Sequence, residues 1–321
     1  MTRFAAIRRA APIPTGLVFL GVVVLGGGNA VAVGIANREI APLWEATLRF
    51  GVAAVVLVVA VLATRTPWPR GRALTGSVLY GAVGFAGAFG LIHWSLVQAP
   101  PAHVQTMLAL VPLVTFLLAV AQRLERFRIT GLIGALIAFE GIAVIFGEQL
   151  GSSTPLTSLA AAIVGAVCLA ESNVILKRFP KCHPLANNAV AMAVGTALLL
   201  AASVALGESR AAPGNPATVV AIAYAALGGT VVVFMLFIEV VSRWTASAAS
   251  YVMPLMPLLT ILLASVTTGA ALTWPFVIGG GLVLTGVYVG AFARRQVGSG
   301  ASTVAGTSTS RVQSAAQPGC A

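Results

Sequence analysis

The sequence predicts an all-α integral membrane protein whose ten transmembrane helices form two inverted five-helix repeats. Three observations support this fold class. Of the 321 residues, 58% are hydrophobic and 8% are charged, too few charges to cover a soluble domain. A segment of the first half recurs in the second. The basic residues gather in every second loop, which fixes the number of membrane crossings.

Ten apolar segments are long enough to cross about 30 Å of hydrocarbon as helices. We expect helices over residues 16–36, 43–63, 74–97, 104–122, 129–147, 159–176, 185–206, 218–241, 246–266 and 274–293. The expected domains are a cytoplasmic N-terminal segment (1–14), a first repeat (15–147), an external linker (148–157), a second repeat (158–293) and a disordered cytoplasmic tail (294–321). The tail is rich in Ser, Thr and Gly and has nothing to bury.

The internal repeat is clearest between Ala109–Ala119, ALVPLVTFLLA, and Pro254–Ala264, PLMPLLTILLA, at a constant offset of 145 residues. In the same register, Gly134 matches Gly279 and Gly141 matches Gly286. A repeat with five helices enters the membrane from opposite sides in its two copies. The halves are therefore predicted to be inverted, with a site between them, as in many secondary transporters.

Each copy carries a proline in the middle of its apolar run. Pro112 and Pro257 each remove a helix hydrogen bond and free the carbonyl four residues earlier, at Leu108 and Met253. Such interrupted backbone is tolerated in a bilayer only beside protein or a water-filled cavity. We therefore expect Pro112, Pro254 and Pro257 to line a cavity near the middle of the membrane.

The loops predict the orientation. With the N-terminus inside, sixteen of the nineteen basic residues lie in cytoplasmic segments, so both termini are expected in the cytoplasm. These sixteen are Arg3, Arg8, Arg9, Arg65, Arg70, Arg72, Arg123, Arg126, Arg128, Lys177, Arg178, Lys181, Arg243, Arg294, Arg295 and Arg311. Because arginine far outnumbers lysine and alanine, glycine and valine are abundant, we expect a multi-pass protein of a bacterial cytoplasmic (inner) membrane.

Two stretches resemble a known family. The segment IAPLWEATLRF, which ends in Arg49-Phe50, and the segment VPLVTFLLAVAQRLERFRITGLIGALIAFEGI, with Glu125 between proline and glycines, are similar to the EamA-type members of the drug/metabolite transporter superfamily. The second repeat departs from this pattern, with Ala270 in place of the glutamate and Ala191 where the arginine would fall. The resemblance implies ten helices, two EamA repeats and export of small metabolites such as amino acids, or of toxic compounds.

Charged side chains inside predicted helices are candidates for function, because each costs about 2.5–3.5 kcal/mol at the bilayer centre. Arg49 follows Glu45 by four residues, so the two either form a structural ion pair or leave Arg49 to bind an anionic substrate group. Glu171 has no basic partner within one turn and is a candidate for substrate binding and proton coupling. Glu140 and Glu239 are further candidates for proton coupling. Their alternatives are an interhelical hydrogen bond for Glu140 and an ion pair with Arg243 for Glu239.

Polar and aromatic candidates complete the predicted substrate site. Asn29 and Asn173 match across the repeat. Glu171 and Asn173 lie about 200° apart on a regular helix, so only one can face a cavity, and the sequence does not choose between them. Trp94 and Tyr251 are candidates for substrate binding. The alternative for Trp94 is an anchor at the membrane interface, and for Tyr251 it is packing.

The composition limits other functions. Basic residues lie between apolar segments and form no nucleic-acid patch. The chain contains no aspartate, and His93 and His103 have no metal-binding spacing, so we expect no metal, no cofactor and no enzyme activity. The predicted function is export of small metabolites by alternating access, with proton coupling left open. The alternatives are an uncoupled channel-like facilitator and a lipid-modifying membrane enzyme. The expected partners are a small-molecule substrate and the lipid bilayer, and a homodimer is left open.

Overall fold

The computed structural model describes residues 14–151, 154–268 and 272–292. Within these ranges the secondary structure is helical, and ten helical segments are long and apolar enough to cross a membrane. This confirms the predicted number of helices and the fold class. The N-terminal segment and the tail, for which we predicted cytoplasmic positions, lie outside the described residues.

Five crossings come from the first repeat. They are α1 (Thr15–Ala36); α2 (Pro42–Thr64); α3 (Arg72–Leu79), η1 (Tyr80–Ala88) and α4 (Phe89–Ser95); α5 (Pro101–Leu108) and α6 (Val111–Ala121); and α7 (Ile129–Phe146), followed by η2 (Gly147–Gly151). The second repeat supplies α8 (Leu156–Arg178); α9 (Pro184–Ala205); α10 (Pro216–Ala226), η3 (Leu227–Val232) and α11 (Val233–Arg243); α12 (Ala246–Ser250) and α13 (Val252–Thr268); and α14 (Trp274–Val287) with η4 (Tyr288–Phe292).

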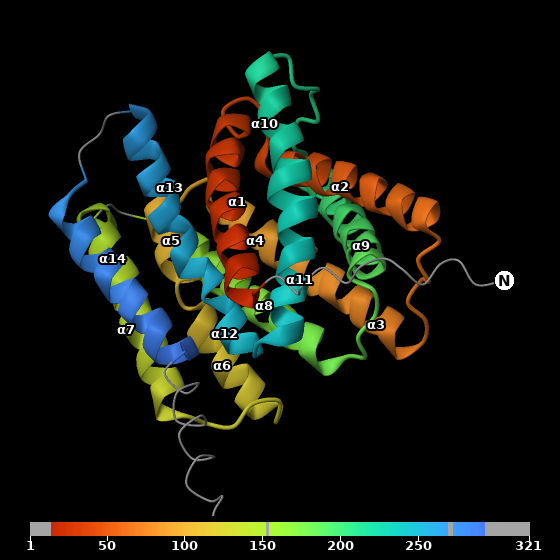
Figure 1. The fold of residues 1–321 in the computed structure, drawn as a ribbon. Helices are drawn as coiled ribbons and strands as arrows, with labels where there is room; N and C mark the ends of the chain where they lie inside the picture. Colours follow the sequence, from red (N-terminus) through yellow and green to blue (C-terminus); the bar gives the residue numbers. More distant parts are fainter. Residues whose placement is uncertain (1–13, 152–153, 269–271, 293–321) are drawn as a thin grey trace, which may run out of the picture.

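The two repeats join along both edges of the molecule. On one edge α7 packs against α14, and on the other α2 packs against α9, with α1, α8, α11 and α13 between them (Figure 1). Each edge pair consists of helices that occupy the same place in the two repeats. The two repeats therefore pack against each other through equivalent helices, in agreement with the internal symmetry of the sequence.

Matched glycines explain the close packing of α7 against α14. A Cβ added to Gly141 would lie 2.6 Å from the carbonyl oxygen of Gly279, and one added to Gly286 would lie 2.6 Å from that of Gly134. Contacts this short leave no room for a methyl group. Small residues let two membrane helices bring their backbones together, and here they do so at the positions paired by the repeat.

Interruptions of the helices also follow the repeat. The fourth crossing breaks between α5 and α6, just before Pro112, and the ninth breaks between α12 and α13 at Tyr251, with Pro257 inside α13. The third and eighth crossings each contain a π-helical segment, η1 and η3. Such segments are rare and occur frequently at functional sites.

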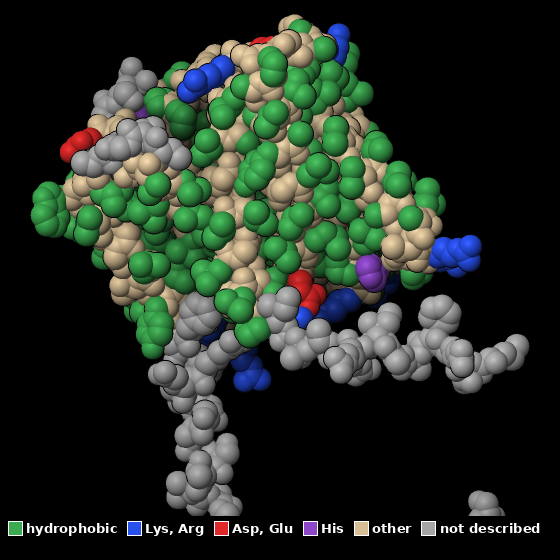
Figure 2. Space-filling view, turned by 45° about the horizontal axis from the view of Figure 1, so that its top comes forward, with side chains coloured by type: hydrophobic (Ala, Val, Ile, Leu, Met, Phe, Trp, Pro, Cys, Tyr) green, Lys and Arg blue, Asp and Glu red, His purple; other side chains and the backbone are tan. Residues whose placement is uncertain are grey.

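The two ends of the molecule differ in charge. One end, here called the basic end, carries the loops after α2, α6, α8 and α11, and the other, here called the opposite end, carries the loops after α1, α4, α7 and α9. The described basic residues of the basic end are Arg65, Arg70, Arg72, Arg123, Arg126, Arg128, Lys177, Arg178, Lys181 and Arg243. Between the ends, hydrophobic side chains cover most of the visible face, and charged groups lie near its margins (Figure 2).

Candidate functional site

A cavity of about 440 Å³ lies between the two repeats. Its walls come from α1, α2, η1, α4 and α5 of the first repeat and from α8, η3, α11 and α13 of the second. We call it the central cavity. Asn37, Arg38 and Pro101 line it at the opposite end, so the cavity extends to that end of the molecule. Toward the basic end its lining stops at Tyr80, Asn173 and Phe237.

The lining combines an aromatic wall with a few polar groups. The aromatic side chains are Phe85 and Phe89 from the third crossing and Phe234 and Phe237 from the eighth. The polar lining residues include Asn29, Arg49, His93, Ser172, Asn173, Thr230 and Thr260. Binding sites for small molecules commonly have this composition, in which apolar walls supply contact area and polar groups fix orientation.

The proline-interrupted segments contact the central cavity in both repeats. Leu108 and Met253, whose carbonyls the central prolines free, both line it. Pro257 also lines the cavity, whereas Pro112 is buried and neither it nor Pro254 is among the lining residues. The internal repeat therefore places equivalent backbone positions on the cavity wall, although only one of the three candidate prolines is exposed to it.

Three ionisable side chains form a buried cluster at the cavity wall. Glu45 is 0% exposed, Arg49 2% and His93 3%. The Arg49 Nε atom lies 4.0 Å from Glu45 Oε1, and His93 Nε2 lies 3.4 Å from Glu45 Oε2. These distances allow ion pairing, but neither Glu45 oxygen accepts a hydrogen bond from the described residues. The cluster therefore retains unused hydrogen-bonding capacity beside the cavity.

Local structure explains how the cluster is assembled. Glu45 and Arg49 are four residues apart on α2, which places them on one face of that helix. The Arg49 guanidinium lies over the rings of Phe50 and Phe89, with its Cζ atom 4.5 and 5.5 Å from their centroids. Aromatic faces attract a cation and replace part of the hydration that burial removes. The same guanidinium keeps Nε and Nη2 without a hydrogen-bond partner among the described residues.

The two matched asparagines both line the central cavity. Asn29 comes from α1 and Asn173 from α8. The side chain of Asn29 occupies the space that a Cβ at Gly229 would need, and its Oδ1 has no hydrogen-bond partner in the described chain. Gly229 belongs to η3, so the residue that makes room for Asn29 lies in the π-helical segment.

Glu171 faces away from the central cavity. Its carboxylate accepts two hydrogen bonds, of 3.0 and 2.8 Å, from Nε2 of Gln122. Arg178 donates to the Oε1 of the same glutamine at 3.1 Å. Because Asn173 lies on the other side of α8 and lines the cavity, the structure chooses the asparagine for that wall. A role for Glu171 in proton coupling stays a prediction.

The other candidates also lie outside the central cavity lining. Glu239 pairs with Arg243 through a 2.7 Å hydrogen bond from Nε, as their spacing predicts. Glu140 is exposed on the surface of α7 and makes no hydrogen bond within the described chain, so the expected interhelical bond is absent. Trp94 is partly exposed, as an interfacial anchor would be, and Tyr251 is buried beside Gly290. Their roles in binding or coupling stay predictions.

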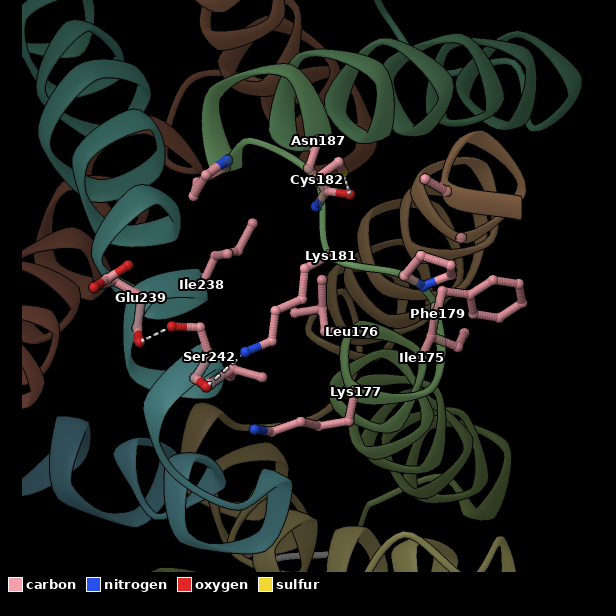
Figure 3. A pocket seen from close by; sticks show the side chains of 15 residues that line it. Ile175, Leu176, Lys177, Phe179, Lys181, Cys182, Asn187, Ile238, Glu239 and Ser242 are labelled. Carbon is pink, nitrogen blue, oxygen red and sulfur yellow. Dashed lines mark hydrogen bonds between the residues drawn. The ribbon is translucent and has the colours of Figure 1, made fainter. Parts of the chain in front are cut away.

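A second, smaller cavity of about 240 Å³ lies at the basic end. Figure 3 shows Lys177 and Lys181 extending toward α11, where Glu239 and Ser242 line the other side, and the ammonium of Lys181 donates to the Ser242 carbonyl at 3.2 Å. The lining residues come from α3, α8, α11 and the start of α9, together with the loop between α8 and α9. The third, sixth and eighth crossings line both cavities.

Sequence reasoning did not identify Glu45 and His93 as members of a site. His93 stands in an apolar segment, and only the fold shows that it reaches Glu45 on another helix. Among the described residues, no group of three His, Cys, Asp or Glu side chains could hold a metal ion.

A ten-helix membrane protein built from two repeats, with a cavity between them that extends to one end, has the architecture of a secondary transporter. The chain belongs to the EamA-like transporter family, whose model matches residues 14–147 and 156–291. This confirms the resemblance found in the sequence, and the family identifies the protein as a membrane transporter.

Proteins similar to the chain include two curated proteins and a solved structure. A protein of Streptantibioticus cattleyicolor described as a "probable terminal-alkyne amino-acid exporter" is 27% identical over 261 residues, covering 80% of this chain and 86% of that protein. The uncharacterized transporter YyaM of Bacillus subtilis is 26% identical over 257 residues, covering 77% and 83%. A crystal structure at 23% identity has a TM-score of 0.74 and covers 88% of this chain and 98% of its own, which supports the fold.

Proposed function

We propose that the protein exports small amino-acid metabolites with apolar side chains across a bacterial cytoplasmic membrane by alternating access. The observation that carries this proposal is the buried Arg49 guanidinium on the wall of the central cavity, with two nitrogen atoms lacking a hydrogen-bond partner in the described chain. A guanidinium binds a carboxylate through paired, charge-assisted hydrogen bonds. The α-carboxylate of an amino acid fits this group.

The rest of the cavity supports an apolar amino-acid side chain. Phe85, Phe89, Phe234 and Phe237 form its aromatic wall, whereas Asn29 and Asn173 offer side-chain carbonyls to an ammonium group. The cavity volume of about 440 Å³ lies in the range of small-molecule sites, about 300–1,000 Å³. The name of the Streptantibioticus relative, which refers to terminal-alkyne amino acids, agrees with a short apolar side chain.

The charge of the two ends supports a cytoplasmic basic end. Ten of the described basic residues lie there, and membrane proteins retain such loops in the cytoplasm. The central cavity then extends to the outer surface, while the helices close around it at the cytoplasmic end. A pathway that is closed at one end favours alternating access over an open channel.

Transport in proteoliposomes tests the proposal. We expect purified wild-type protein to move radiolabelled L-propargylglycine and L-leucine but not leucinamide, which lacks the carboxylate. Hydrogen bonds to a charged group contribute about 1.5–3 kcal/mol, and 1.4 kcal/mol is a factor of ten, so Arg49→Gln should reduce kcat/KM by about 10- to 100-fold.

The matched control is Arg65→Gln, which removes the same charge from the exposed C-terminal cap of α2, outside the cavity lining. It should transport as the wild type does. Equal transport of leucine and leucinamide, or full activity of Arg49→Gln, would refute the role of Arg49 in binding a carboxylate.

A further inference from the structure

The hydrogen bond of His93 fixes which of its ring nitrogens carries a proton. Its Nδ1 lies 2.8 Å from the carbonyl oxygen of Phe89, one turn earlier in the same helix. A carbonyl oxygen can only accept, so Nδ1 must donate. The other nitrogen, Nε2, is the atom that faces Glu45 at 3.4 Å.

With Nδ1 protonated, the contact between His93 Nε2 and the Glu45 carboxylate needs one more proton. If the imidazole is neutral, Nε2 presents a lone pair, and an ionised Glu45 presents another lone pair to it. Two acceptors facing one another in a buried site repel unless a proton lies between them. The imidazolium with a carboxylate, or the neutral imidazole with a carboxylic acid, removes this conflict. The pair therefore forms a site for a single proton.

Occupation of this site changes the charge that Arg49 experiences. Without the proton, Glu45 is the negative partner of Arg49, and the cluster of Arg49, Glu45 and His93 is neutral overall. With the proton, the Glu45–His93 pair is itself neutral, and the cluster carries the single positive charge of Arg49. A substrate carboxylate then meets an uncompensated guanidinium, whereas in the unprotonated state it must compete with Glu45.

We propose that Glu45 and His93 form a proton-binding site coupled to carboxylate binding at Arg49, so that the proton and the carboxylate occupy the central cavity together. This inference rests on the proposed function, because it takes Arg49 as the carboxylate site. It adds the ion that accompanies the substrate and the two residues that hold it. Binding of either one strengthens binding of the other by the same factor.

The other ionisable groups near the pair leave Arg49 as its main electrostatic partner. Helix α9, which packs against α2, contains no ionisable residue, and Tyr80 of η1 is a phenol. On α8, which packs against α4, Cys168 is a thiol, Glu171 is bound to Gln122, and Lys177 and Arg178 lie at the basic end. Further ionisable groups on the surrounding elements are Arg38 at the cavity mouth, Glu208 in the loop after α9, which accepts from the start of α2, Tyr224 on α10 and His103 on α5.

Joint occupation has a consequence for energetics. The proton and the carboxylate cross the membrane in the same direction, as in a symporter. A zwitterionic amino acid then carries one positive charge per cycle, and a monoanionic acid carries none. An acidic exterior opposes export under this scheme, so accumulation of the metabolite inside the cell must drive its release.

Calorimetry of L-propargylglycine binding tests the coupling. Titrations in buffers of different ionisation enthalpy report how many protons the protein takes up with the ligand. For the wild type we expect uptake of up to one proton per ligand, with affinity rising as the pH falls. Glu45→Gln imitates the protonated acid, so it should bind at every pH as tightly as the wild type does at low pH, without proton uptake.

The second variant gives the opposite result. His93→Gln leaves Glu45 ionised beside Arg49, so binding should be about tenfold weaker at low pH and should take up no proton. The control His183→Asn removes an exposed histidine at the basic end and keeps a side-chain acceptor at the N-cap of α9. It should retain the proton uptake of the wild type. Weaker binding by Glu45→Gln at every pH would overturn the proposal, since Glu45 would then only position Arg49.

The outcomes also separate this inference from the proposed function. Binding that requires Arg49 but takes up no proton overturns the proton site and leaves the carboxylate site intact. If the wild type does not bind the probe, the proposed function fails, and the proton site is judged without ligand by NMR of protein labelled with ¹⁵N-histidine. There we expect His93 Nδ1 to stay protonated and the ¹⁵N chemical shift of Nε2 to change when Glu45 is replaced by Gln. An Nε2 shift that is the same in both proteins overturns the proton site.

Discussion

At both ends of the protein, glutamate carboxylates of one repeat accept hydrogen bonds at helix N-termini of the other repeat, but the consequence differs between the ends. At the opposite end, Glu208 accepts hydrogen bonds from the amides of Leu43 and Trp44 at the start of α2, and Glu39 accepts from Gly214 and Asn215 before α10. At the basic end, Glu125 accepts from the amide and the hydroxyl of Ser247 at the start of α12. Each carboxylate joins the two repeats at a helix N-terminus, where the backbone favours negative charge.

The basic end differs because its carboxylate, that of Glu125, contacts the ninth crossing, which is interrupted between α12 and α13. Helix α12 leads directly into α13, which lines the central cavity, so the contact from Glu125 to Ser247 fixes a cavity wall. In the register of the repeat, Glu125 corresponds to Ala270 and Ser247 to Ala102. We call the contact between Glu125 and Ser247 the latch. Alanine side chains cannot form such a contact, so the corresponding pair of residues provides no latch. The asymmetry of the sequence thus matches a cavity that extends only to the opposite end.

The largest expected effect concerns the packing of α7 against α14, which lies between the two ends. Helices α7 and α14 approach through glycine backbones, and a Cβ at Gly141 would lie 2.6 Å from the Gly279 carbonyl oxygen and 2.8 Å from the Val283 amide nitrogen. Gly141→Ala should lower the free energy of unfolding by at least about 1–3 kcal/mol, the usual cost of overpacking, because backbone must move. Thermal unfolding of detergent-solubilised protein measures this loss.

Gly281→Ala is the matched control. It lies on α14, and a Cβ there would meet no atom within 4 Å. We expect it to unfold at the wild-type temperature or slightly above, since alanine favours a helix. Similar unfolding temperatures for the two variants would contradict the close approach of α7 and α14.

A second prediction tests the latch at the basic end. The Glu125 carboxylate makes bonds of 3.0 and 2.5 Å to Ser247, and a charged hydrogen bond contributes about 1.5–3 kcal/mol. Glu125→Ala should therefore increase the population open at the basic end about tenfold or more, at 1.4 kcal/mol per factor of ten. Cys182 reports this opening, because it lines the second cavity and burial raises the pKa of its thiol.

The measurement is the rate of maleimide labelling of Cys182 at pH 8, in a background with Cys168→Ala and Cys320→Ser. Opening exposes the Cys182 thiol and removes the burial that raises its pKa. The labelling rate should therefore increase in Glu125→Ala. Glu148→Ala, which removes an exposed carboxylate at the opposite end, should leave the rate unchanged. An unchanged rate in Glu125→Ala would show that the latch does not hold this end closed.

Hydropathy and the internal repeat predicted most of the fold. The ten crossings, the inverted halves and the matched glycines follow from features that one-dimensional patterns record directly. The match between Asn29 and Asn173 also identified two residues of the cavity wall. These predictions succeeded because an inverted repeat places equivalent residues around one axis.

The faces of the helices could not be predicted in the same way. In a bilayer, apolar residues suit both the lipid side and the interior, so an apolar crossing gives no sign of its rotation. Sequence alone therefore left Glu171 and Asn173 as alternatives and expected an interhelical bond for Glu140, whose side chain is exposed. It also missed His93, since its contact with Glu45 depends on how the second and third crossings pack together.

The smallest predicted effect concerns the opposite end. Hydrogen bonds from the side chain of Thr218 and from the amides of Gly214 and Asn215 lower the pKa of Glu39 below its ordinary value of 4.5. A carboxyl whose pKa is lowered by folding stabilises the folded state above its unfolded pKa, and this stabilisation is lost as the pH falls through the folded pKa. The contact should therefore weaken only below about pH 4.5.

Glu39→Gln tests this contact, because it removes the charge and keeps one acceptor oxygen. Since Glu39 is at the solvent surface, we expect the variant to differ from the wild type by no more than a few degrees in unfolding temperature at pH 7. The difference should disappear as the pH is lowered below 4.5, where Glu39 itself takes up a proton. A difference that stays constant down to pH 3 would mean that the charge of Glu39 does not hold the start of α10. The opposite end would then depend on a single carboxylate, that of Glu208, which accepts hydrogen bonds at the start of α2.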